Sequence, residues 1–224
     1  MIRIFIFSYA GDAAEATACV RCARMAVPCA SVTVVDDASH PVREETAEVL
    51  RSMGAEYVQS SWERHGNLRG PDCIRGMLSE MCRDAGDDDI LVKVDCDTAL
   101  LDGGWLRWME QRRWCQMYAS GSLVDGEWMI YGCLYALRGR VARRLLRDMD
   151  WENMDALAPE DWTIGRAALA SFPAALARID EPWSQRTPWS SWTAWCWYSL
   201  TASPERYASR FAVVTTGNPR LDTQ

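Results

Sequence analysis

Short apolar runs alternate with longer amphipathic runs through the first hundred residues of the chain. The apolar runs are rich in Val, Ile and aromatic residues, which favour strands, and they cover Ile2–Phe7, Ser31–Asp36, Glu56–Gln59 and Ile90–Asp95. The segments between them predict helices, namely an Ala-rich run that ends near Met25, then Pro41–Met53 and Pro71–Asp84. This alternation is typical of an α/β protein in which helices cover both faces of a parallel sheet.

The second half of the chain has a less regular pattern. Strands are predicted at Trp114–Ser120 and Trp128–Leu137, and helices at Trp105–Arg113, Gly139–Met149 and Asp161–Ser171. No internal repeat, low-complexity linker or clear boundary interrupts the 224 residues. We therefore expect residues 1–224 to form one mixed α/β domain.

Polar side chains follow three of the predicted strands at the points where the strands end. These positions are Ser8-Tyr9, Asp36-Asp37 and Asp95-Cys96-Asp97. Ligands of parallel sheets bind outside the carboxyl ends of the strands, so these residues are candidates for a site. Asp95 and Asp97 can share a divalent cation with a diphosphate, because Mg²⁺ and Mn²⁺ prefer oxygen ligands. Alternatively, Asp97 could simply begin a turn and Asp95 could cap the next segment.

Composition narrows the class of function. The net charge is -7 and the pI is about 4.9, which argues against a nucleic-acid binder. Lys93 is the only lysine, so contacts of basic side chains with phosphate are expected to come from Arg. No apolar run is long enough to span a membrane, and Met1–Phe7 is too short for a signal peptide. The nine scattered cysteines favour reduced thiols in the cytoplasm, although zinc or redox chemistry at Cys19 and Cys22 stays open.

Taken together, these motifs resemble those of GT-A-fold glycosyltransferases, and most closely the large inverting family 2. The segments that carry the resemblance follow one another in the family's order: Phe7–Ala10, Val34–Ser39, Gly70 to Arg75, Val94–Asp97 and Pro159–Trp162. The resemblance implies a GT-A (nucleotide-diphospho-sugar transferase) fold, with a mixed, mostly parallel central sheet flanked by helices. Residues 1–100 would form the nucleotide-binding half and residues 101–224 the acceptor-binding half.

The resemblance also implies a reaction, in which one sugar moves from a UDP-linked donor to an acceptor hydroxyl with inversion. The nucleotide would be bound by Ser8, Tyr9, Asp36, Asp37, Arg75 and Asp95. Asp97, with Asp95, would bind Mn²⁺ or Mg²⁺, and Gly132 would lie behind the donor sugar. Asp161, with Glu160 beside it, would be the catalytic base. The implied acceptor is a glycan or a lipid-linked saccharide.

Departures from the family pattern limit what the resemblance implies. Ala10 and Gly76 stand where the family usually has Asn. No His follows Asp95-Cys96-Asp97, which matches the family's D-x-D motif. The Q-x-x-R-W signature of processive synthases is absent, so transfer of a single sugar is expected. The protein would work in the cytoplasm or peripherally at the inner face of a membrane. A homo-oligomer is compatible with the sequence.

Several alternatives remain open at this stage. Asp36-Asp37 could simply end a strand in a turn. Glu160-Asp161 could have no role other than to complement the dipole of the helix that they begin. The chain could also be an inactive relative that binds nucleotide sugars or glycans. Asp95-Cys96-Asp97-Thr98 roughly matches the nucleophile motif of haloacid-dehalogenase phosphatases, but here the motif follows the fourth strand instead of the first. The five tryptophans between Trp183 and Trp197 could form an acceptor platform, a core or a subunit interface.

Overall fold

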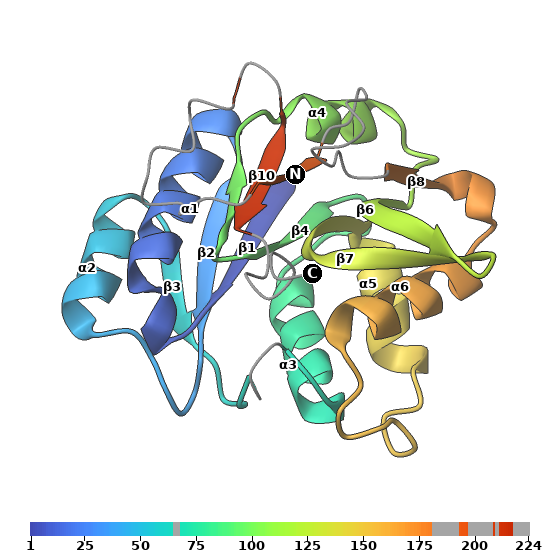
Figure 1. The fold of residues 1–224 in the computed structure, drawn as a ribbon, viewed down its shortest axis with the longest axis horizontal. Helices are drawn as coiled ribbons and strands as arrows, with labels where there is room; N and C mark the ends of the chain where they lie inside the picture. Colours follow the sequence, from blue (N-terminus) through green and yellow to red (C-terminus); the bar gives the residue numbers. More distant parts are fainter. Residues whose placement is uncertain (65–67, 181–192, 197–207, 209–210, 217–224) are drawn as a thin grey trace, which may run out of the picture.

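The computed structural model describes residues 1–64, 68–180, 193–196, 208 and 211–216, with only the backbone at 193–196 and 216. Its main feature is a seven-stranded sheet in the order β3-β2-β1-β4-β7-β6-β8. The strands are β1 (Ile2–Ser8), β2 (Ser31–Asp36), β3 (Glu56–Gln59), β4 (Ile90–Asp95), β6 (Met117–Val124), β7 (Glu127–Arg138) and β8 (Ala177–Asp180). β7 runs antiparallel to β4 and β6, and the other pairs are parallel (Figure 1). The expected mixed, mostly parallel sheet is confirmed.

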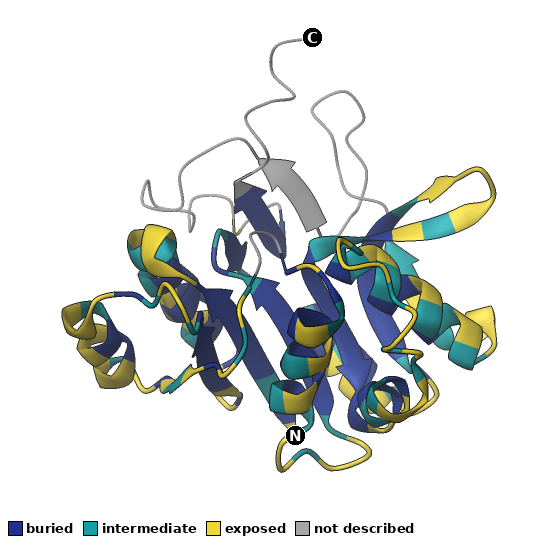
Figure 2. Cartoon of the chain, turned by 90° about the horizontal axis from the view of Figure 1, so that it is seen from below, coloured by how far each residue is buried: buried dark blue, intermediate teal, exposed yellow. Residues whose placement is uncertain are grey.

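Helices cover both faces of this sheet, as the alternation of strands and helices predicts. They are α1 (Ala13–Ala26), α2 (Glu44–Ser52), α3 (Pro71–Cys82), α4 (Gly104–Gln111), α5 (Gly139–Asp148) and α6 (Glu160–Ser171), with short 3₁₀ turns at Ala10–Asp12 and Ala174–Leu176. In β1, Ile4 and Ile6 pack into the core with α1, α2 and α4, while Phe5 and Phe7 pack with α3, α5 and α6. The central strands are buried on both faces (Figure 2), which is the reason for their continuous apolar sequence.

A second, three-stranded sheet was not predicted from the sequence. It has the order β5-β10-β9, formed by Thr98–Leu100, Val213–Thr216 and Thr193–Cys196. β5 begins directly after the D-x-D residues, and β10 pairs with it antiparallel. The Thr98 and Thr215 hydroxyls are hydrogen-bonded at 2.9 Å, and Thr215 also donates to the backbone oxygen of Asp97 at 3.5 Å. A distant part of the chain therefore braces the turn that carries the two aspartates.

Two predicted elements begin three residues later than expected. The helix predicted from Pro41 begins at Glu44, because Arg43 is extended and the Val42 N–H donates to the Asp36 carboxylate instead of joining a helix. The strand predicted from Trp114 begins at Met117, because the Cys115 N–H closes a turn on the Arg112 oxygen. Among the described residues, no helix has the length and apolar character needed to cross a membrane.

Candidate functional site

The expected site residues at the strand ends meet at one edge of the main sheet. In the parallel strands Ser8 lies opposite Asp36, and Phe7 lies opposite Asp95, so the carboxyl ends of β1, β2 and β4 are aligned. β7 runs the other way, and Leu134 pairs with Val94. Gly132, two residues earlier in β7, therefore reaches the same edge from the opposite direction.

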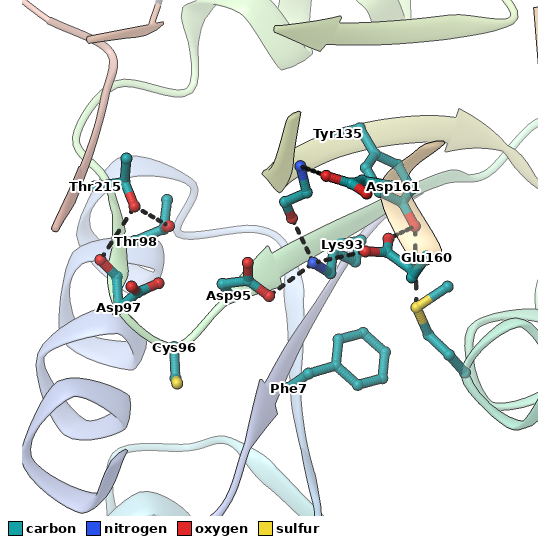
Figure 3. Close-up of polar contacts among 12 residues, drawn as sticks. Phe7, Lys93, Asp95, Cys96, Asp97, Thr98, Tyr135, Glu160, Asp161 and Thr215 are labelled. Carbon is teal, nitrogen blue, oxygen red and sulfur yellow. Dashed lines mark hydrogen bonds and ion pairs between the residues drawn. The ribbon is translucent and has the colours of Figure 1, made fainter. Parts of the chain in front are cut away.

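Lys93 lies at the centre of the site, although it was not predicted as a site residue. Its side chain is 1% exposed, and its ammonium is 2.7 Å from Asp95 Oδ1 and 3.4 Å from Glu160 Oε2 (Figure 3). It also donates a hydrogen bond to the backbone oxygen of Gly132. Burial alone would lower the pKa of Lys93, but Asp95 and Glu160 hold that pKa above its usual value. The ammonium is therefore charged, as its carboxylate partners require.

Glu160 and Asp161 begin helix α6 but occupy different environments. Glu160 is 3% exposed, and the Tyr135 hydroxyl donates to its Oε1. Burial raises the pKa of Glu160 to about 7, and Lys93 only partly offsets this rise. Asp161 is half-buried, and its two oxygens accept from the backbone N–H groups of Gly132 (3.2 Å) and Trp162 (2.7 Å). Asp161 is the more accessible of the two carboxylates, whereas Glu160 is enclosed by the protein.

Gly132 allows the close approach between β7 and the start of α6. A Cβ atom at this position would lie 3.1 Å from Asp161 Cβ and 3.2 Å from Glu160 Oε2. The backbone of Gly132 meanwhile donates to Asp161 and accepts from Lys93. A side chain here would push the two carboxylates away from β7. The expected role of Gly132 behind a donor sugar stays a prediction.

Asp95 and Asp97 lie half-buried on either side of Cys96 (Figure 3). Cys96 itself is buried and donates to Asp12 Oδ2 at 2.6 Å. No group of three or more His, Cys, Asp or Glu side chains that could hold a metal ion occurs among the described residues. Mg²⁺ and Mn²⁺ sites of nucleotide enzymes commonly use one or two carboxylates plus phosphates and water. Asp97 and the second oxygen of Asp95 fit such a site.

Asp36 and Asp37 shape the loop that follows β2. Asp36 is fully buried, and its Oδ2 accepts from the Val42 N–H (2.7 Å) and the Tyr57 hydroxyl (2.5 Å). Asp37, 5% exposed, accepts backbone N–H groups from Ser39, His40 and Arg64. Burial would raise the pKa of Asp37, but these N–H groups outweigh it and hold the pKa below its usual value. Contact of either aspartate with a nucleotide stays a prediction.

Arg64, and not the expected nucleotide-binding residue Arg75, lies at the end of β1. Its guanidinium carbon is 4.9 Å from the centre of the Tyr9 ring, and Nη1 donates to Asp12 (3.2 Å) and to the Phe7 oxygen (3.3 Å). Arg75 instead lies exposed on α3, in a groove of about 520 Å³ beside Trp62. The structure thus brings Arg64 to the edge of the sheet.

Ser8 lies at the same edge. Its side chain is 1% exposed, and Oγ has no hydrogen-bond partner among the described residues. Buried hydroxyls are usually hydrogen-bonded, so this oxygen is a candidate contact for a ligand.

Comparison with known proteins supports one fold. At the sequence level no family model and no curated protein matches the chain. Among solved structures it is similar to the galactosyltransferase LgtC bound to donor and acceptor sugar analogues, with a TM-score of 0.58, 15% identity, and 97% of this chain and 87% of that chain covered. It is also similar to glucosyl-3-phosphoglycerate synthase from Mycobacterium tuberculosis in complex with Mn²⁺, UDP and glucosyl-3-phosphoglycerate (TM-score 0.55, 14% identity, 81% and 69% covered).

A third similar structure is the mannosyltransferase PcManGT from Pyrobaculum calidifontis in complex with GDP-Man and Mn²⁺ (TM-score 0.51, 15% identity, 81% and 54% covered). All three are sugar transferases, and the alignments span most of this chain. The chain has the GT-A fold. At these identities the likeness establishes the architecture alone.

In this GT-A fold, the side chains of the tryptophan cluster from Trp183 to Trp197 lie outside what the structure describes, so the role of the cluster as platform, core or interface stays open. The cysteines whose side chains are described carry free thiols.

Two site residues were missed in the sequence, for different reasons. Lys93 interrupts the apolar run of β4, and a charge at such a position signals a buried ion pair, so it could have been found. Arg64 lies in an irregular loop, where nothing in the local pattern distinguishes it from the other arginines.

Proposed function

We propose that this chain is a metal-assisted glycosyltransferase that moves one sugar from a nucleotide-diphospho-sugar to an acceptor hydroxyl with inversion. The observation that carries the proposal is the arrangement at the carboxyl edge of the sheet. There Asp95 and Asp97, both half-buried, follow β4, and Asp161 is held on the neighbouring strand β7 by the Gly132 N–H (Figure 3). One end of the site can hold a cation and a diphosphate, and the other offers a carboxylate to a hydroxyl.

On the donor side, Asp97 and Asp95 would hold Mn²⁺ or Mg²⁺, and Ser8, Tyr9 and Arg64 would contact the nucleotide. The bound cation would neutralise charge on the leaving diphosphate. The Arg64 guanidinium is held over the Tyr9 ring, next to the end of β1, where a diphosphate could accept its hydrogen bonds. We favour UDP as the nucleotide, in line with the sequence resemblance.

On the acceptor side, Asp161 would take the proton from the attacking hydroxyl. The acceptor oxygen forms a bond to the anomeric carbon while the bond from that carbon to the diphosphate oxygen breaks. The proton goes to Asp161 and the nucleoside diphosphate leaves. A single displacement of this kind inverts the anomeric centre. A positioned base contributes roughly 10²- to 10⁴-fold to such a step. The acceptor would be a glycan or a lipid-linked saccharide.

The first experiment is thermal unfolding with UDP, GDP, TDP and CMP, each with and without Mn²⁺ or Mg²⁺. A ligand at 100 times its Kd stabilises by about 2.7 kcal/mol. At this chain length each kcal/mol raises the unfolding midpoint by roughly 2–4 °C. We expect a metal-dependent shift with one nucleotide, and we expect Asp97→Ala to remove the metal dependence. The proposal would be refuted if no nucleotide shifts the midpoint under any of these conditions.

The second experiment tests the base in a transfer assay. Asp161→Asn should retain the nucleotide-dependent shift and lose transfer by about 10²- to 10⁴-fold. The matched control is Asp125→Asn in the β6–β7 turn, where φ is +51° and Asn is tolerated. It should transfer normally. If Asp161→Asn transfers at the wild-type rate, Asp161 is not the base. Nucleotide binding without transfer to any acceptor would instead favour the inactive binding relative.

A further inference from the structure

One positive charge contacts both ends of the candidate site. Lys93 projects from β4, two residues before Asp95, yet its ammonium also reaches the Gly132 oxygen and Glu160. Gly132 is 39 residues away in the sequence, and Glu160 begins α6, the helix that carries Asp161. The strand of the metal-binding pair and the helix of the candidate base thus meet on a single side chain.

We propose that Lys93 is a positioning residue, which fixes the Asp95 end of β4 relative to the Glu160-Asp161 end of α6. The bound donor sugar and the base Asp161 are thereby held at fixed positions relative to each other. The inference rests on the proposed function, because it deepens the description of that same site. Lys93 does not touch substrate in this proposal. It acts through Asp95 on the donor side, and through Glu160 and the Gly132 carbonyl on the acceptor side.

The construction of the cluster supports this role. The Lys93 side chain is 1% exposed and the Glu160 side chain 3%, so both groups are held by the protein and not by water. The Tyr135 hydroxyl donates to Glu160 from the strand beside β4, which fixes the carboxylate from a second side (Figure 3). A buried charge with several partners is held in one geometry, because each lost contact leaves an uncompensated group. The cluster is therefore a rigid link instead of a mobile surface pair.

Gly132 extends the link to the candidate base itself. Its carbonyl accepts from Lys93 while its N–H donates to Asp161 Oδ2. A change in the position of the Lys93 ammonium is therefore transmitted to Asp161 by two routes, through the peptide at Gly132 and through the adjacent residue Glu160. Misplacement of a reacting group by about 1 Å can cost roughly 10²-fold in rate. Loss of the link should lower kcat by about 10- to 100-fold and leave the KM for the donor nearly unchanged.

Because Lys93 is the only lysine, its ammonium can be observed by itself. Protein labelled with ¹⁵N-lysine gives one Nζ signal in a ¹H–¹⁵N spectrum. A solvent-exposed ammonium exchanges its protons too fast to be seen at neutral pH, whereas the buried, hydrogen-bonded Lys93 should give a visible signal. In Glu160→Gln this signal should move or disappear. Asp161→Asn is the matched control, since Asp161 contacts the Gly132 N–H and not the ammonium. In this variant the Lys93 signal should remain visible.

Metal binding gives a readout that does not depend on turnover. Addition of UDP with Mn²⁺ should broaden the Lys93 signal, because Asp95 joins the ammonium to the proposed metal site, while UDP with Mg²⁺ should shift it without broadening. In the transfer assay, Lys93→Met and Glu160→Gln should each lower kcat at constant KM. Their double variant should lose less than the product of the two effects, because both changes break one link.

The outcomes separate this proposal from the proposed function. If UDP and metal leave both the unfolding midpoint and the Lys93 signal unchanged, the transferase proposal fails. If they bind but Lys93 has no visible signal, or Glu160→Gln leaves that signal unmoved, the positioning role is overturned. Additive effects in the double variant would overturn it as well. Should Lys93→Met fail to fold, Glu160→Gln and the spectra of the wild-type protein decide the question.

Discussion

The substitution Glu160→Gln tests the electrostatics of the buried cluster through stability alone. Burial raises the pKa of Glu160 from 4.5 to about 7, so between these values the folded protein holds a proton that the unfolded chain releases. Stability therefore falls as the pH rises through this window. A shift of this size corresponds to about 3 kcal/mol, at about 1.4 kcal/mol per pKa unit. Gln keeps the shape of the protonated side chain and cannot ionise.

We therefore expect the free energy of unfolding of Glu160→Gln, relative to the wild type, to rise by about 3 kcal/mol between pH 4.5 and pH 8. Urea denaturation at several pH values measures this difference, and the other titrating groups cancel because both proteins carry them. Glu110→Gln, on the exposed face of α4, controls for the substitution itself. A flat difference across the range, or a fall with pH, would show that Lys93 keeps Glu160 ionised throughout and would refute the reasoning.

Three further substitutions test other parts of the site. Gly132→Ala should cost about 1–3 kcal/mol of stability, because its Cβ would lie 3.1 Å from Asp161 Cβ, and it should also lower kcat while nucleotide binding persists, as turnover and calorimetry can measure. Tyr57→Phe should destabilise the fold by about 1–3 kcal/mol in urea denaturation, since Asp36 Oδ2 loses a 2.5 Å hydrogen bond in a buried site. Arg64→Met should weaken UDP binding about tenfold in titration calorimetry, whereas Arg75→Met should leave it unchanged. The reverse result would restore Arg75 to the nucleotide site.

The part of the fold that rests on local pattern could be predicted from the sequence. Strands β2, β3 and β4 match their predicted bounds, because each is a short run with β-branched or aromatic residues between turn residues. The second sheet could not be predicted in the same way. β5 has only three residues, and its pairing with β10 joins segments more than a hundred residues apart. Local propensity carries no information about such a contact.

The candidate site shows the same division. The acidic residues at the strand ends were found because parallel strands align their carboxyl ends, and the structure places Asp36 and Asp95 on neighbours of β1. What each carboxylate binds could not be read from the pattern. Asp36 accepts hydrogen bonds from the Tyr57 hydroxyl and the Val42 N–H, and Glu160 is buried beside Lys93. These partners depend on how strands and helices pack in three dimensions.

The pairing of β5 with β10 has a consequence for biosynthesis. Thr98 and Thr215 are 117 positions apart, and their hydrogen bond lies beside the backbone of Asp97. On a ribosome, the parallel strands β1 to β4 can form soon after they emerge, but the turn that carries Asp97 stays unbraced until residue 216 has been added. Contacts of such long sequence separation form late, because loop closure has to precede them. The aspartates would therefore reach their final arrangement only once β10 has been made, after strands β1 to β4 have folded.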